Sequence, residues 1–338
     1  MIIIALYDIL GDNKNVGGKD MNSKIGIVGL GHVGSQVLTE VMQLGIFREI
    51  VGIDIIDNLA EGEALDHQHT LSLYGTHNVH VKGGTIADLG DADVIIVAAG
   101  ESIKQGSEKP DRTKLTETSA RVIRDVMDQI AKVTKDAIII MITNPLDTML
   151  YIAQTEFDYP KDKIFGTGTT LDSARLRSVI SNYYNVDAKN VQANMLGEHG
   201  MTAFPAFSKI TIDGIPLTEY SNLVGKDLIN EDEVKDYVVQ VANDVLNYKG
   251  YTNAGIAKSA ATLAKAVILD ERSVFPVCTV IDKEYGYSGD VAFSIPTMIG
   301  KEGVIQKLEV ALNEKELGLL HDSAAFIKEI IAKAKAVQ

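Results

Sequence analysis

The stretch from Lys24 to Asp54, KIGIVGLGHVGSQVLTEVMQLGIFREIVGID, decides the fold of this chain. It opens with a short apolar run typical of a buried strand and is then interrupted by three glycines. Apolar residues at helical spacing follow, and a second apolar run precedes Asp54. The pattern predicts a strand, a tight turn, a helix and a second strand.

The glycines and the acidic residue of this unit have separate physical roles. Gly29 permits the tight turn, Gly31 lets the backbone approach a pyrophosphate, and Gly34 lets the helix pack close to the strand. Phosphates can then bind the N–H groups at the start of the helix. Asp54 stands about 20 residues further on, where a carboxylate accepts hydrogen bonds from ribose hydroxyls and repels a 2′-phosphate. We therefore predict an NAD site. A glycine-rich turn without a ligand is the simpler alternative for the glycines alone.

Length and composition favour a soluble two-domain protein. The chain has 338 residues and a net charge of -14, and such an anionic surface argues against nucleic acid and membrane partners. Cys278 is the only cysteine, which excludes an internal disulfide and suits a reducing cytoplasm. No apolar run approaches the roughly 20 residues that span a bilayer. We expect a cytoplasmic location.

Residues 1–21 differ from the rest, because they precede the first predicted strand and lack the basic region and cleavage site of a signal peptide. We hypothesise that Met21 is the true start and that the preceding residues are a non-native leader; a disordered extension is the alternative.

The remaining chain divides near residue 165. Buried strands at residues 93–100, 137–143 and 163–166 alternate with helices, which predicts a doubly wound parallel α/β sheet of the Rossmann type over residues 22–165. Residues 166–338 are expected to form an α+β domain, with antiparallel strands at 206–212 and 274–281. A final helix carries an apolar stripe from Leu317 to Ile331, which predicts core packing or, alternatively, a subunit interface.

Polar residues follow two of these strands, at the edge where doubly wound sheets bind ligands. A loop after Gly100 leads to Arg112, and we hypothesise that it is a lid whose guanidinium polarises a carbonyl; an exposed loop arginine is the alternative. Asn144 precedes Pro145, which forces it out of helical geometry and leaves its amide free to bridge cofactor and substrate. A turn asparagine without function is the alternative.

A second group of candidates opens the predicted α+β domain. Asp172 and Arg175 lie three residues apart at the start of a helix and therefore share one face. They form either a surface ion pair or a functional pair, in which Arg175 binds a carboxylate with its two-pronged fork and Asp172 orients a histidine. His199 stands between glycines, where an imidazole can act as a general acid or base.

Four further histidines lie in the first half, but we do not predict a metal site, because no cysteine accompanies them and surface histidines are commoner than ligands. They are His67, His69, His77 and His80.

Several motifs in order resemble the L-lactate/L-malate dehydrogenase family. They are GLGHVG at residues 29–34, TNPLD at 143–147, GTGTTLDSARLR at 166–177, GEHG at 197–200 and KGYT at 249–252. The resemblance implies an NAD-dependent L-2-hydroxyacid dehydrogenase that reversibly reduces a 2-oxo acid as a homodimer or homotetramer.

The resemblance also implies a role for each matching residue. His199 would give and take the proton, Asp172 would be its partner, and Arg175 would anchor the substrate carboxylate. The remaining substrate contacts would be Arg112, which polarises the carbonyl, with Asn144, Thr252 and Ile103. The residues expected to bind the cofactor are Gly29, Leu30, Gly31, His32, Val33, Gly34, Asp54, Gly100 and Asn144.

The sequence departs from the commonest family members at the substrate-specifying position. Ile103 stands where lactate enzymes carry glutamine and malate enzymes arginine, the segment up to Arg112 is about three residues longer, and Ala254 replaces a frequent aromatic. These features resemble L-2-hydroxyisocaproate dehydrogenase and favour an apolar or branched-chain substrate. L-lactate dehydrogenase is the alternative. Malate dehydrogenase is a weaker one, in which Lys104 or Lys109 would pair with a second carboxylate.

Two other expectations follow from comparison with known classes. Some relatives are activated by a sugar bisphosphate through an arginine and a histidine; Arg177 matches the arginine, but Gln192 stands at the histidine position, so we expect no such activation. NAD-dependent glycosidases would need a Cys and His metal site, and a non-catalytic NAD sensor would have no use for His199 together with Asp172 and Arg175.

Overall fold

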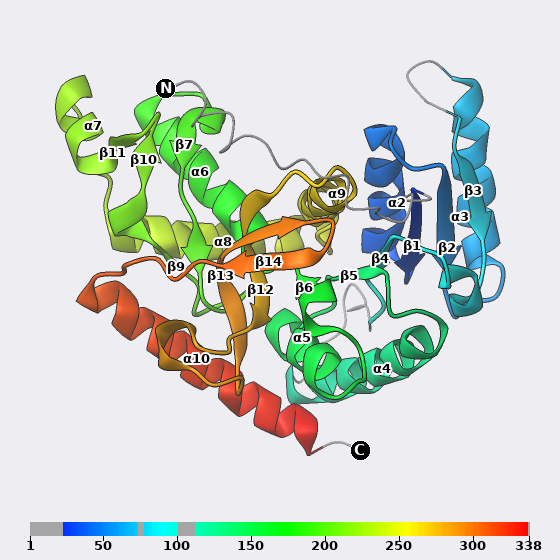
Figure 1. Cartoon of the computed structure of the whole chain (residues 1–338). Coiled ribbons are helices and arrows are strands. Elements are labelled where there is room, and N and C mark those ends of the chain that lie inside the picture. Colours follow the sequence, from blue (N-terminus) through cyan, green and yellow to red (C-terminus); the bar gives the residue numbers. More distant parts are fainter. Residues whose placement is uncertain (1–22, 74–77, 101–111, 337–338) are drawn as a thin grey trace, which may run out of the picture.

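A computed structural model describes residues 23–73, 78–100 and 112–336, with the side chains of residues 112–114 left out (Figure 1). The strands are β1 (Lys24–Val28), β2 (Glu49–Ile53), β3 (His80–Gly83), β4 (Val94–Val97), β5 (Ile138–Met141), β6 (Ile164–Gly166), β7 (Val191–Gln192), β8 (Met195–Leu196), β9 (Phe204–Pro205), β10 (Thr211–Ile212), β11 (Ile215–Pro216), β12 (Ser273–Val280), β13 (Ala292–Gly300) and β14 (Gly303–Lys307). The α-helices are α2 (His32–Leu44), α3 (Leu59–His69), α4 (Arg112–Val133), α5 (Leu146–Thr155), α6 (Thr170–Tyr184), α7 (Leu217–Val224), α8 (Glu231–Lys249), α9 (Ala254–Ile268) and α10 (Glu314–Lys335). No helix within these ranges is long and apolar enough to cross a membrane.

One sheet of nine strands runs through the molecule in the order β14-β13-β12-β6-β5-β4-β1-β2-β3. The six strands from β6 to β3 are parallel, and their order is that of a doubly wound dinucleotide-binding sheet. The predicted α/β fold class is therefore confirmed. Because β12 pairs antiparallel with β6 through Cys278 and Gly166, the antiparallel hairpin β12–β14 extends the same sheet.

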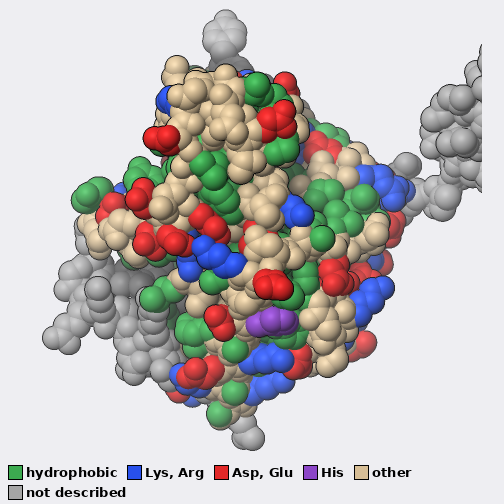
Figure 2. All heavy atoms as spheres, turned by 90° about the vertical axis from the view of Figure 1, so that its left-hand side faces the viewer, with side chains coloured by type: hydrophobic (Ala, Val, Ile, Leu, Met, Phe, Trp, Pro, Cys, Tyr) green, Lys and Arg blue, Asp and Glu red, His purple; other side chains and the backbone are tan. Residues whose placement is uncertain are grey.

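Alternation along the strands places apolar side chains in two cores, one on each face of the sheet. Ile95 and Val97 of β4 pack in the core under α4, α5 and α10, whereas Val94 and Ile96 pack in the core under α2 and α9. Figure 1 shows α10 running along the outside of α5, on the opposite face from α9. The face in Figure 2, which lies on the left of Figure 1, carries acidic and basic side chains interspersed with apolar ones.

The apolar stripe of the last helix packs within the chain. Leu320, Ala324, Ile327 and Ile331 are all buried in the core that α4 and α5 share, while Leu317 is half-buried beside it. The core-packing interpretation of this stripe thus accounts for its buried residues. The expected homodimer or homotetramer stays a prediction.

The expected strand at residues 206–212 is wrong. Strand β9 ends at Pro205, a 3-10 turn spans Phe207–Lys209, and only Thr211–Ile212 form a second strand. The buried carboxylate of Glu316 on α10 accepts hydrogen bonds at 2.8 Å from both the backbone N–H and the hydroxyl of Ser208. These bonds hold the chain in a turn where apolar alternation alone indicated an extended strand. A tight turn at Asp213 and Gly214 joins β10 to β11.

Candidate active site

The glycine-rich turn between β1 and α2 has the close packing that its glycines suggested. Gly29 has a φ of 91°, and a Cβ on it would lie 2.6 Å from the backbone of Ala99. A Cβ on Gly34 would lie 1.8 Å from the carbonyl oxygen of Gly29. Gly31 stands at the N-cap of α2, where no side chain accepts a hydrogen bond from the helix. The first turn of α2 is therefore open to a ligand's phosphate.

Asp54 is fixed against this turn rather than left free at the end of β2. Its Oδ2 accepts a hydrogen bond from the backbone N–H of Leu30 at 2.7 Å, and its Oδ1 accepts one from Ile56 at 2.9 Å. Beside it is a surface hollow lined by Asp54, Ile56, Asp57, Asn58, Ala60, Glu61, Gly83 and Gly84. A carboxylate in this position can bind ribose hydroxyls at the edge of the hollow.

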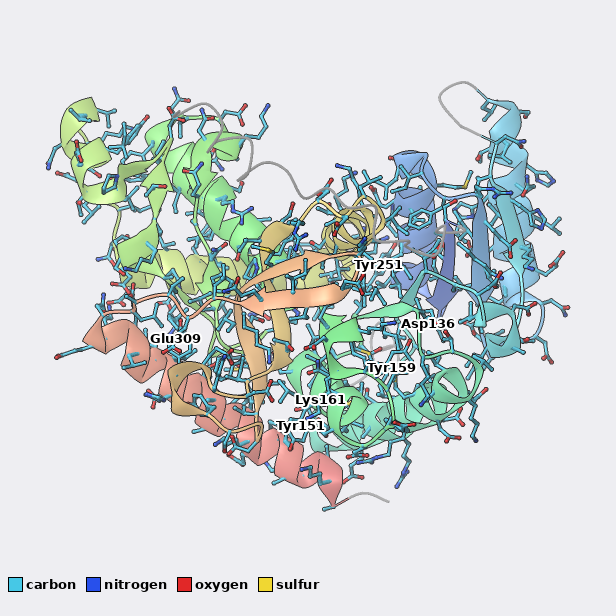
Figure 3. All side chains as sticks on the ribbon, in the orientation of Figure 1. Asp136, Tyr151, Tyr159, Lys161, Tyr251 and Glu309 are labelled. Atoms are coloured by element: carbon cyan, nitrogen blue, oxygen red, sulfur yellow. The ribbon has the colours of Figure 1, made fainter. Side chains whose placement is uncertain are left out.

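An aromatic contact joins the dinucleotide turn to the segment before α9. The ring of His32 stacks on Tyr251 with centroids 4.0 Å apart and planes 6° from parallel, and Figure 3 shows Tyr251 beside α9. Tyr251 immediately precedes Thr252, which is half-buried. The stack therefore fixes the position of Thr252 relative to the start of α2.

Asp172, Arg175 and His199 form one hydrogen-bonded cluster. Asp172 Oδ2 lies 2.7 Å from His199 Nδ1, and Asp172 Oδ1 lies 2.7 Å from Arg175 Nη1. Asp172 is supplied by the first turn of α6 and is buried, while His199 lies in the loop after β8 with 20% of its side chain exposed. One carboxylate thus orients both an imidazole and a guanidinium.

The charges in this cluster stabilise a protonated histidine. Burial works against the imidazolium, but the carboxylates of Asp172 and Asp147 outweigh it and raise the pKa of His199 to about 9. Burial alone would raise the pKa of Asp172, yet the neighbouring charges of His199 and Arg175 hold it below its ordinary value. At neutral pH the imidazole is therefore a cation and can donate a proton.

Asp147 lies under the same loop, and no role was predicted for it from the sequence. Its Oδ2 accepts a hydrogen bond from the backbone N–H of His199 at 2.8 Å. Burial, together with the charge of Glu198, raises the pKa of Asp147 to about 6. A signal was present in the sequence, because Asp147 is the only charged residue of α5, whose ten residues are otherwise apolar or neutral.

The other candidates lie at the ends of β4 and β5 or outside the described residues. Asn144 is exposed and stands three residues before Asp147, and the hydroxyl of Thr143 donates to the carbonyl oxygen of Ala99, holding the ends of the two strands together. Gly100 is exposed at the end of β4. Ile103, Lys104 and Lys109 lie outside the described residues, as do His77 and residues 1–21; Arg112 begins α4 without a described side chain.

His67 and Arg177 have local hydrogen-bond partners. His67 lies between Thr39 Oγ1 and the carbonyl oxygen of Glu63, and no group of three or more His, Cys, Asp or Glu residues within the described ranges could hold a metal ion. Arg177 donates to the carbonyl oxygen of Ala193 at 3.0 Å, while Gln192 accepts a hydrogen bond from Thr211. Arg177 and Gln192 thus each have a hydrogen-bond partner within the chain.

Comparison with known proteins identifies the fold and its chemistry. Residues 23–166 match the profile of the lactate/malate dehydrogenase NAD binding domain, and residues 169–338 match that of the alpha/beta C-terminal domain. The chain belongs to the lactate/malate dehydrogenase family. It is 46% identical to L-lactate dehydrogenase 2 of Clostridium acetobutylicum, covering 92% of this chain and 97% of that protein. It is 41% identical to L-lactate dehydrogenase of Selenomonas ruminantium, covering 91% and 96%.

Solved structures agree with the family. The minor L-lactate dehydrogenase from Enterococcus mundtii aligns with a TM-score of 0.86 at 31% identity, covering 91% of this chain and 97% of that one. Cryptosporidium parvum malate dehydrogenase aligns with a TM-score of 0.87 at 28% identity, covering 94% and 100%. As a lactate/malate dehydrogenase family member, the chain is an NAD-dependent L-2-hydroxyacid dehydrogenase, and its substrates are 2-oxo and 2-hydroxy acids. The glycosidase and NAD-sensor alternatives are thereby set aside.

Proposed function

We propose that this protein is an L-lactate dehydrogenase, which reduces pyruvate to L-lactate and catalyses the reverse reaction. The single observation that carries the chemistry is the bridge from Asp172 to both Arg175 and His199, each at 2.7 Å. The names of the relatives from Clostridium acetobutylicum and Selenomonas ruminantium support lactate as the substrate.

The cofactor fits the turn that the chain provides. Gly29 and Gly34 let the turn pack closely against the backbone, the uncapped first turn of α2 can bind a diphosphate, and Asp54 offers its carboxylate to the ribose. NADH bound there would supply the hydride. The chain's own residues supply orientation, positive charge and the proton.

The substrate's carboxylate would bind Arg175. A guanidinium binds a carboxylate through two parallel hydrogen bonds, and Asp172 keeps that of Arg175 in place from the other side. This fixes the direction of the 2-oxo group and converts a collision into a positioned transfer. We assign Arg112 to the carbonyl oxygen, with Asn144 and Thr252 lining the same pocket.

The proton would come from His199. Because Nδ1 faces Asp172, the proton on Nε2 is the one directed to the substrate. The carbonyl carbon accepts the hydride, and the carbonyl oxygen accepts this proton, which gives the L-2-hydroxy acid and a neutral imidazole. In the reverse direction the same nitrogen takes the proton back. We place the enzyme in the cytoplasm and expect it to act as a homo-oligomer.

A branched-chain substrate is the second candidate, and specific sequence features favour it. Ile103 is apolar where lactate enzymes carry glutamine, and Ala254 is small and exposed at the start of α9. Both would accommodate a larger apolar side chain, as in L-2-hydroxyisocaproate dehydrogenase. The lactate proposal is preferred because the relatives from Clostridium acetobutylicum and Selenomonas ruminantium are named lactate enzymes.

The test is NADH oxidation with pyruvate, 2-oxoisocaproate and oxaloacetate. We expect the highest kcat/KM with pyruvate. A clear preference for 2-oxoisocaproate would refute the lactate proposal and support the second candidate, whereas a preference for oxaloacetate would refute both. His199→Gln is the matched control: it should bind NADH normally, as measured by cofactor fluorescence, and lose reduction of every substrate.

A further inference from the structure

The carboxyl group of Asp147 is buried beneath the site without the pairing that such a group normally has. Its side chain is 4% exposed, and its Oδ1 accepts no hydrogen bond from an N–H or O–H group among the described residues; its side-chain partner is the thiol of Cys278, a weak donor. The titratable groups around it are the thiol of Cys278 on β12 and, in the loop after β8, Glu198 and His199. A buried, half-satisfied carboxylate costs stability, so its presence calls for a function.

The one good hydrogen bond of Asp147 leads directly to the histidine. Asp147 Oδ2, on α5, accepts a hydrogen bond from the backbone N–H of His199 at 2.8 Å and so holds the loop in place. Asp172, on α6, lies 2.7 Å from the imidazole and holds the ring. His199 is therefore held from two helices, by its main chain on one side and by its ring on the other. Each contact brings a carboxylate close to the imidazole.

The two carboxylates act on the same charge. The groups that face His199 are Asp172 and Arg175 from α6 and Asp147 from α5, and both acids favour the imidazolium while Arg175 disfavours it. The neighbouring Glu198 has its own partners, because its Oε2 accepts hydrogen bonds from the backbone and the hydroxyl of Thr202. Besides Asp172, Asp147 is thus the carboxylate that offsets the repulsion between Arg175 and the imidazolium of His199.

We propose that Asp147 is a positioning residue of the proton-transfer site, which holds the loop of His199 and whose negative charge favours the protonated imidazole. This rests on the proposed role of His199 as the proton donor. Asp147 touches neither substrate nor cofactor and acts through His199. Its charge offsets the positive charge that Arg175 adds near the imidazole, so that the histidine stays a cation beside a guanidinium.

Asp147→Asn tests the charge separately from the hydrogen bond, because the amide oxygen can still accept the His199 N–H. We expect the alkaline limb of the pH profile of kcat/KM for pyruvate reduction to move toward acid by about half to one pH unit. Asp147→Ala removes both interactions and should show the same shift together with a lower kcat. Cys278→Ser changes the packing around the carboxyl without removing its charge and should leave the limb in place.

A second measurement does not need turnover. The imidazole of His199 can be titrated by NMR in the ¹⁵N-histidine-labelled protein and assigned by the signal that His199→Gln removes. Its midpoint should fall in Asp147→Asn by the same amount as the kinetic limb. The proposal is wrong if the midpoint of His199 is unchanged in the folded Asp147→Asn variant. If that variant fails to fold, the proposal is wrong when the wild-type His199 signal titrates near its ordinary value of 6.5. If no 2-oxo acid is reduced but the midpoint shifts, the proposed function fails and the coupling stands.

Discussion

Replacing Asp172 by asparagine should disable proton donation while keeping the shape of the site. The amide oxygen can still accept one hydrogen bond, from Arg175 or from His199, but the negative charge between them is lost. Without that charge, burial dominates and the pKa of His199 should fall from about 9 to its ordinary value of 6.5 or below.

The size of the effect follows from these two values. At pH 7.5 a histidine with a pKa of about 9 is almost entirely protonated, whereas one at 6.5 is protonated in about one molecule in ten. The lost protonation therefore costs about tenfold in the rate of 2-oxo acid reduction. Loss of the fixed ring orientation and tautomer costs more, so we expect a total decrease in kcat/KM of about 10²- to 10⁴-fold.

The assay is NADH oxidation as a function of pH, with NADH binding measured separately by fluorescence. Asp128→Asn is the matched control: it removes a carboxylate 2.6 Å from Lys132 on the surface of α4 and should change neither measurement. If Asp172→Asn keeps the wild-type pH profile and at least a tenth of the wild-type kcat/KM, the assignment of Asp172 as the partner of His199 is refuted.

Three further predictions concern the cofactor site and stability. Gly34→Ala places a methyl group 1.8 Å from the Gly29 oxygen and should abolish NADH binding and lower Tm. Gly62→Ala is the control, because nothing lies within 4 Å of its methyl group, and it should keep both NADH binding and Tm. Equal Tm values for the two variants would contradict the packing argument. Asp54→Asn should reduce the ratio of the Kd for NADPH to the Kd for NADH by about tenfold, and an unchanged ratio would speak against the ribose contact. Because burial raises the pKa of Asp147 from 3.8 to about 6, its ionisation disfavours the folded state by up to about 3 kcal/mol above pH 6. Asp147→Asn should therefore raise Tm at pH 8, with the difference shrinking as the pH falls toward 4; a Tm difference that does not depend on pH would contradict this.

Local patterns were sufficient where the structure depends on neighbours in the chain. The β1–α2–β2 unit and the helix α10 follow from apolar periodicity and glycine placement, which act over a few residues. The strand expected at residues 206–212 failed for the opposite reason. Glu316, over a hundred residues away, holds Ser208 in a turn, and no local pattern reports such a bond.

By itself, the sequence determined the fold class, the dinucleotide turn with Asp54, and the identities of Asp172, Arg175 and His199 as candidates. The tertiary structure decided how they meet: Asp172 bridges the other two, and Asp147 reaches the His199 backbone from 52 residues away. It also decided that β12 joins β6, so that Cys278 lies against Asp147 and the two halves of the chain share one sheet. The physical reason is that burial, charge pairing and strand order between distant segments depend on how the whole chain packs. Turns and apolar periodicity, by contrast, depend on residues that are close together in the sequence.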